Sequence, residues 1–265
     1  MVCMHKSLFI KGLVDIRAQV LFWSIGLGFI CFLTVFLYPN VKDIYSELFE
    51  SLPDAMIAFM GAEHSVDSLE GYLNVEFFTF VPIALAVFAV IAGTGSIRGD
   101  ENQGTLELLL AQPVSRMGLF ITKVLGLVIA NGFIIILLTS IVFLTSWLMG
   151  IEVASGRILS AFGLLWLFLI SITALSILVS LVMPTRVVAG TVVAVWVVVS
   201  HILNSLSEIV DGVGLFKPVY LTSYFQGGNA LGSEISLGYL VGLAAILIVS
   251  LLLGGWIFIR RDIAV

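Results

Sequence analysis

Apolar residues dominate the chain in six long blocks that contain no Asp, Glu, Lys or Arg. The uncharged blocks are 24, 21, 28, 28, 21 and 25 residues long. A helix needs about 20 apolar residues to cross roughly 30 Å of hydrocarbon, whereas a membrane strand needs only about 10 alternating residues. Lipid also requires every backbone group to be bonded internally, which a helix achieves alone. We therefore expect six transmembrane helices, at approximately 20–37, 77–97, 124–149, 159–183, 187–206 and 237–259.

Lys and Arg are distributed unevenly between the two sides that six spans create. Both termini fall on one side, which holds 9 of the 12 basic residues, whereas 12 of the 17 acidic residues fall on the other. An excess of Lys and Arg marks the cytoplasmic side of a membrane. We therefore expect both termini and one large segment, 98–123, in the cytoplasm. The corresponding outer loops are 38–76, 150–158 and 207–236.

Composition agrees with a membrane protein. The chain is 60% hydrophobic and only 11% charged, whereas a soluble domain carries about 25% charged residues. These proportions predict an all-α membrane protein and argue against a soluble enzyme. The net charge of −5 argues against a nucleic-acid partner.

The residues before the first span have an amphipathic pattern. Phe9, Leu13, Ile16 and Val20 follow one another at spacings of four, three and four. This spacing places them on one face of a helix. We expect an amphipathic interfacial helix on the cytoplasmic surface. The alternative is a first span that is slightly longer than 20–37.

Motifs for catalysis, nucleotide binding and metal binding are missing from the sequence. No Gly-x-x-x-x-Gly-Lys-Ser/Thr phosphate loop, His-Glu-x-x-His, Gly-x-Ser-x-Gly or zinc-type Cys/His spacing occurs. We therefore expect no catalytic residues, no metal site and no cofactor on this chain. No span carries an ionisable Asp, Glu, Lys or Arg near its middle, which argues against an ion-coupled transporter.

The large cytoplasmic segment predicts a short helix between two breaks. Gly104 permits a turn, and Thr105 can cap a helix from Leu106 to about Ala111. Pro113 then ends that helix. Ser115 can cap the helix that leads into the third span. The short helix has an apolar face formed by three leucines, Leu106, Leu109 and Leu110, so this face requires a partner.

The stretch from Glu101 to Arg116, ENQGTLELLLAQPVSR, resembles the motif between the second and third spans of ATP-binding-cassette type-2 exporter permeases. That family motif has a Glu, then Gly-Thr, a leucine-rich helix and Pro-Val-Ser-Arg. The six-span layout, the long first outer loop and the N-terminal surface helix also agree with the family. The resemblance therefore covers the chain as a single transmembrane permease domain, 1–265.

The resemblance implies a permease of an ATP-driven exporter, working as a dimer with a second copy of the chain. Two separate ATPase subunits would bind ATP and Mg and would dock on the 101–116 segment. The chain itself would be a transport subunit without enzyme activity, in the plasma (inner) membrane of a prokaryote. The candidate coupling residues are Glu101, Gly104, Thr105, Leu106, Glu107, Leu109, Leu110, Pro113, Ser115 and Arg116.

Several alternatives remain at this point. The chain could be a secondary transporter or channel that needs no ATPase, or a permease that supports maturation of copper enzymes. The 98–123 segment could be a stable hairpin without a partner. The residues that bind a substrate cannot be identified from the sequence pattern.

Overall fold

A computed structural model describes residues 2–53, 68–102, 104, 115–207, 210, 212–225, 231 and 237–261. Within these residues every element is helical and none is a strand, which confirms the predicted all-α class. Five helices are long and apolar enough to cross a membrane, or six if one bent pair is counted as a single span. The long helices are α1 (Val2–Ser51), α4 (Val81–Ser96), α7 (Arg116–Met149), α8 (Ser155–Val182), α9 (Arg186–Leu206) and α11 (Leu237–Arg260).

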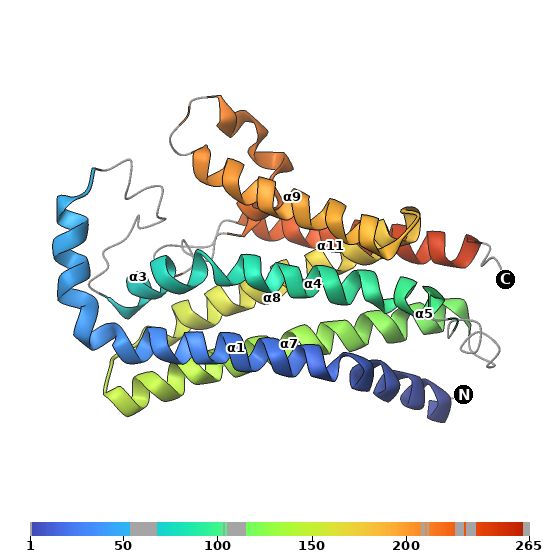
Figure 1. The fold of residues 1–265 in the computed structure, drawn as a ribbon, viewed down its shortest axis with the longest axis horizontal. Helices are drawn as coiled ribbons and strands as arrows, with labels where there is room; N and C mark the ends of the chain where they lie inside the picture. The colour runs from blue at the N-terminus through green and yellow to red at the C-terminus, as the bar shows by residue number, and fades with distance from the viewer. Residues whose placement is uncertain are drawn as a thin grey trace.

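Helix α1 is much longer than the first predicted span. The amphipathic N-terminal segment and the span form one helix, and the helix continues through Pro39 into the predicted outer loop 38–76. Figure 1 shows α1 changing direction in its later part and leading away from the other long helices. The rings of Tyr38 and Tyr45 lie 5.4 and 5.2 Å from the ring of Tyr72, so aromatic packing supports the helix on both sides of the proline.

The second span is a broken helix. Helix α3 (Leu69–Leu73) and the π-helix η1 (Asn74–Phe78) meet α4 at an angle of 45°. The helical structure therefore begins before the predicted span 77–97. Two acidic residues lie in the earlier part. The Glu70 carboxylate accepts the Ala154 N–H at 2.6 Å, and the Glu76 carboxylate accepts the Tyr45 hydroxyl.

Helix α8 is the central helix of the bundle. In its most apolar stretch 72% of the residues are buried, compared with 22% for α9 and for α11. It packs against α4, α7 and α11. Gly93 of α4 allows a close approach to α8, because a Cβ at that position would lie 2.8 Å from the Thr173 carbonyl oxygen. The central position of α8 explains why it is apolar on all sides.

Two short 3-10 helices, η2 (Val213–Val219) and η3 (Leu221–Tyr224), precede α11. Phe225, directly after η3, stacks against Phe78 and lies 5.2 Å from the Phe168 ring of α8. These aromatic contacts join the break in the second span to the central helix.

The two termini lie at the same end of the bundle, next to the short helix α5 (Arg98–Asn102) (Figure 1). This end also contains the beginning of α7 and the beginning of α9. It is the end to which the sequence analysis assigned most of the Lys and Arg residues. The structure therefore places the described ends of the 98–123 segment, 98–102 and 115–123, at the same end of the bundle as both ends of the described chain.

Candidate functional site

The candidate residues that the structure describes lie at the basic end of the bundle, at the start and the end of the 101–116 segment. These four are Glu101, Gly104, Ser115 and Arg116. The other six lie outside the described residues, namely Thr105, Leu106, Glu107, Leu109, Leu110 and Pro113. The described residues therefore define how the segment is attached to the bundle.

The segment begins where α5 ends. Gly104 has a φ of +66°, which is the left-handed conformation that glycine adopts at little cost. Its N–H donates to the Glu101 carbonyl oxygen at 3.0 Å and closes a turn. The turn that the sequence predicted at Gly104 is confirmed.

The segment ends at the first residue of α7. Ser115 has extended backbone angles, and its hydroxyl oxygen accepts the Gly118 N–H at 3.0 Å. This is the N-cap geometry that satisfies one of the free N–H groups of a helix start. The predicted cap at Ser115 is confirmed.

Glu101 joins the start of the segment to the end of α11. Its carboxylate lies 2.8 Å from the Arg98 guanidinium and 3.0 Å from the Arg261 guanidinium. The side chains of Arg98, Glu101 and Arg261 are 10%, 21% and 26% exposed, so water screens these pairs only in part. Glu101 is thus held between two cations from different parts of the chain.

Arg116 attaches the other side of the segment to the same place. Its guanidinium donates to the carbonyl oxygen of Ile259 at 3.2 Å and to that of Arg261 at 2.8 Å. Carbonyl groups at the end of a helix have no partner within the helix and carry a partial negative charge. Both sides of the segment therefore bind the C-terminal end of α11.

Arg98 connects the segment to the link between α8 and α9. Its guanidinium donates to the carbonyl oxygens of Met183 and Pro184 while it also binds Glu101. Arg98 is buried, and the three acceptors compensate for the burial of its charge. The link between the helices is short, so these bonds hold α5 directly against the ends of α8 and α9.

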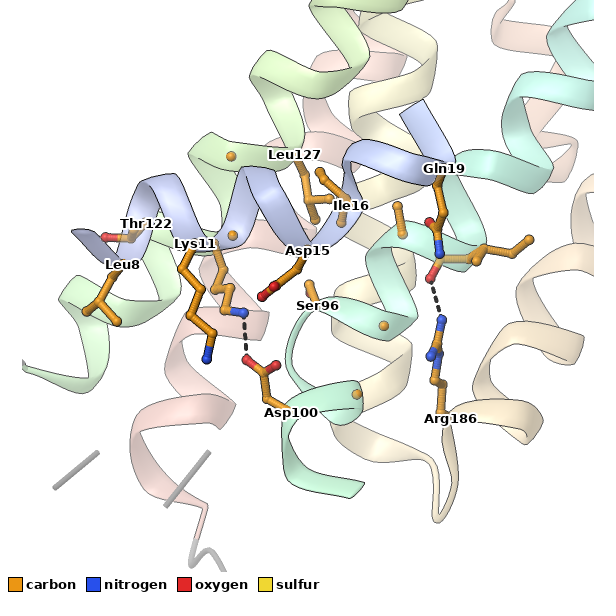
Figure 2. Close-up of a pocket in the computed structure, with 17 residues that line it drawn as sticks. Leu8, Lys11, Asp15, Ile16, Gln19, Ser96, Asp100, Thr122, Leu127 and Arg186 are labelled. Atoms are coloured by element: carbon orange, nitrogen blue, oxygen red, sulfur yellow. Dashed lines mark hydrogen bonds and ion pairs between the residues drawn. The ribbon is translucent and has the colours of Figure 1, made fainter. Parts of the chain in front are cut away.

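A cavity of about 450 Å³ lies beside this network, between α1 and the ends of α4, α5 and α7. Lys123 of α7 forms an ion pair of 2.6 Å with Asp100 of α5 at its edge. Arg186 of α9 donates to the Ile91 carbonyl oxygen at 3.2 Å on another side. Figure 2 shows both interactions, with Asp100 and Arg186 on different sides of the cavity.

The sequence analysis did not include Arg98, Arg261, Asp100 or Lys123 among the candidate site residues. Arg98 and Lys123 border uncharged blocks, Arg261 follows the Arg260 that ends another, and these three basic residues were used only to orient the chain. Their positions next to apolar blocks could have indicated that they meet at one end of the bundle. Their partners depend on how the helices pack, which the sequence pattern does not contain.

The site consists of ion pairs and hydrogen bonds that hold helices of the bundle together. Each described carboxylate of the network is paired with a cation. The network attaches the described ends of the 101–116 segment to α5, α7, α11 and the α8–α9 link.

Comparisons with known proteins agree with the family resemblance. A family model described as "ABC-2 family transporter protein" matches residues 7–214. The chain is also similar to the uncharacterized protein YhcI of Bacillus subtilis (strain 168), with 29% identity over 116 residues. This match covers 43% of the present chain and 34% of YhcI, so it spans about a third of that relative.

Proposed function

The chain belongs to the ABC-2 transporter family and is a multi-pass membrane permease subunit, and we propose that ATP hydrolysis on a separate partner drives export through it. The partner is an ATPase present in two copies, which binds ATP and Mg. Two copies of the permease form the substrate pathway. The 101–116 segment is the coupling element on which the ATPase docks.

One observation carries the proposal: both sides of the 101–116 segment are attached to the end of α11. Glu101 binds the Arg261 guanidinium and Arg116 binds the Arg261 carbonyl oxygen. A force applied to the segment is therefore passed to α11 and, through Arg98, to the α8–α9 link. A hairpin that only connects two spans would not need bonds to other helices.

The distribution of charge supports a cytoplasmic position for this end. The basic residues Arg98, Arg116 and Arg261 belong to the ion-pair network, and Lys123 and Arg186 line the cavity beside it. An excess of Lys and Arg favours the cytoplasmic side, where a soluble ATPase would be present. The proposed location is the plasma membrane of a prokaryote.

A double substitution in the segment tests the docking proposal. Glu107→Arg with Leu109→Asp reverses one charge and removes part of the predicted apolar face. We expect this variant to lose co-purification with an ATPase encoded next to the permease, and to lose permease-dependent stimulation of ATP hydrolysis. The matched control is Glu47→Arg with Leu48→Asp, which makes the same changes on an exposed part of α1 far from the segment.

The outcomes separate the competing functions. Loss of binding in the segment variant together with normal binding in the control supports the coupling role. Equal binding by both variants overturns it. Substrate flux through liposomes that contain the permease alone, without ATP, would instead support a secondary transporter or channel.

A further inference from the structure

The cavity beside the ion-pair network has walls from five helices. The amphipathic part of α1 covers it, and α4, α5, α7 and Arg186 of α9 complete it. Its volume of about 450 Å³ lies within the range of small-molecule sites. Figure 2 shows Lys11 and Asp15 on α1 facing Asp100 on α5.

Positive charges exceed negative charges in this cavity. Lys11, Lys123 and Arg186 line it together with Asp15 and Asp100. The Asp100 carboxylate is bound by Lys123 at 2.6 Å. Lys11 forms no ion pair with any residue that the structure describes, and one recorded bond of Arg186 leaves most of its five donors available. The cavity therefore offers cationic donors to an anion.

Glycines provide the open space of the cavity. Gly12 of α1 and Gly126 of α7 both line it, and a Cβ at either position would have no heavy atom within 4 Å. Gly126 is buried, whereas Lys11 and Asp15 on α1 are exposed, so the cavity extends from inside the bundle to its surface. Arg186 occupies the space next to Gly95, where a Cβ would lie 2.7 Å from Nη2.

The rest of the lining combines apolar residues, which continue onto the outer surface, with the polar residues Gln19, Ser96 and Thr122. Leu8, Ile16, Ala92 and Leu127 line the cavity beside the charged residues. Ile91 lines it as well and is 38% exposed on the outside of the bundle. In a membrane this outer surface faces lipid chains, so the cavity fits a ligand with an anionic head and an apolar body better than a soluble ion.

We propose that this cavity binds the phosphate headgroup of one anionic phospholipid from the leaflet at the basic end of the bundle. The headgroup occupies the cavity between its Lys11 side and its Arg186 side, which Figure 2 shows on either side of Asp15 and Ser96, and the acyl chains follow the apolar wall past Ile91. Basic pockets between membrane helices on the cytoplasmic side are known to hold such headgroups. The site does not depend on an ATPase, so it can fail or hold independently of the proposed function.

Native mass spectrometry of the full chain in detergent tests the proposal. Dioleoyl phosphatidylglycerol is titrated against dioleoyl phosphatidylcholine, which has the same chains and no net charge. We expect one phosphatidylglycerol to bind about fivefold more tightly than phosphatidylcholine, since each nearby Lys or Arg adds an attraction of that order. Glycerol phosphate, which has the anion without acyl chains, is added as a competitor and is expected not to displace the lipid.

Three variants change the site in defined directions. Lys11→Gln is expected to weaken phosphatidylglycerol binding about fivefold, and Asp15→Asn to strengthen it, because one removes an attraction and the other a repulsion. Gly126→Leu is expected to abolish binding by filling the cavity without a change of charge. The matched controls are Lys42→Gln, Asp43→Asn and Gly26→Leu, at exposed positions of α1 outside the cavity.

Three results would overturn the proposal. Equal effects of Lys11→Gln and Lys42→Gln would mean that the lipid binds through general surface charge. Unchanged binding in Gly126→Leu would place the lipid outside the cavity. Displacement by glycerol phosphate would assign the site to a soluble phosphate compound.

Discussion

Glu101 and Arg261 form an ion pair across 160 positions of the sequence, with 3.0 Å between Glu101 Oε1 and Arg261 Nη2. The pair brings the start of the 101–116 segment to the end of the last helix. Because Arg116 binds the backbone of the same arginine, both described ends of the segment are attached to the bundle at one place. The two ends of the segment are therefore held at a fixed distance from each other.

Loss of the Arg261 side chain should loosen the segment. We expect Arg261→Gln to increase amide hydrogen exchange in peptide 103–114 by up to about fivefold, since a partly exposed ion pair contributes about 0.2–1 kcal/mol. Arg260→Gln is the control, because Arg260 lies over the Trp256 ring and does not contact Glu101. Equal exchange in the two variants would contradict the role assigned to the ion pair.

Ser115 should stabilise the start of α7 through its hydroxyl group. We expect Ser115→Ala to lower the free energy of unfolding by about 1 kcal/mol, because the Gly118 N–H loses its acceptor. Ser115→Asp retains an acceptor and should unfold at nearly the wild-type temperature. Thermal unfolding in detergent provides the measurement, and equal losses in both variants would show that the cap does not matter.

Gly93 should tolerate no side chain, whereas Gly126 should tolerate one. A Cβ at Gly93 would lie 2.8 Å from both the Thr173 oxygen and the Ser176 Cβ, so α4 and α8 would have to move apart. We expect Gly93→Ala to destabilise the chain by about 1–3 kcal/mol. Gly126→Ala, in the middle of α7 with open space around it, is the matched control. A similar loss of stability in both would contradict the close packing of α4 on α8.

Glu70 should stabilise the start of α8 from a distance of 84 positions in the sequence. Its carboxylate accepts the Ala154 N–H at 2.6 Å and lies near the positive end of the helix dipole. We expect Glu70→Ala to cost about 1–3 kcal/mol, because the N–H loses its partner, and Glu70→Gln to cost less. Glu47→Ala, on an exposed position of α1, should leave the unfolding temperature unchanged.

The long helices follow closely from the sequence. Block length alone located α7, α8, α9 and α11, because a hydrocarbon layer sets a minimum length that few other structures require. The turn at Gly104 and the helix cap at Ser115 also follow from local residue chemistry. These features depend on neighbouring residues, and neighbouring residues are what a sequence pattern contains.

The charged residues explain where the prediction and the structure differ. Lys42 and Asp43 ended the first uncharged block, yet α1 continues past them because its later part packs on Tyr72. Glu76 likewise marked the start of the second span, although the helical structure begins at Leu69. A count of charges cannot register that Glu70 and Glu76 have bonding partners on other elements.

The ion-pair network shows a different limit of sequence analysis. Arg98 and Arg261 were visible as basic residues beside apolar blocks, but their pairing with Glu101 depends on where α5 and α11 end in space. Helix ends shift by one or two residues in any sequence-based assignment, and a shift of that size moves a side chain to another face. The partners could therefore be found only from the packed helices.

The bonds from Arg98 to the carbonyls of Met183 and Pro184 have a consequence for motion. Only three residues link α8 to α9, so this link can extend very little. A displacement of α5 along the bundle must therefore displace the adjoining ends of both helices. Sliding of α5 alone would remove the two carbonyl acceptors of the buried Arg98 guanidinium and leave only Glu101, at a cost of about 1–3 kcal/mol. At the basic end of the bundle, α5 and the adjoining ends of α8 and α9 are therefore expected to move together.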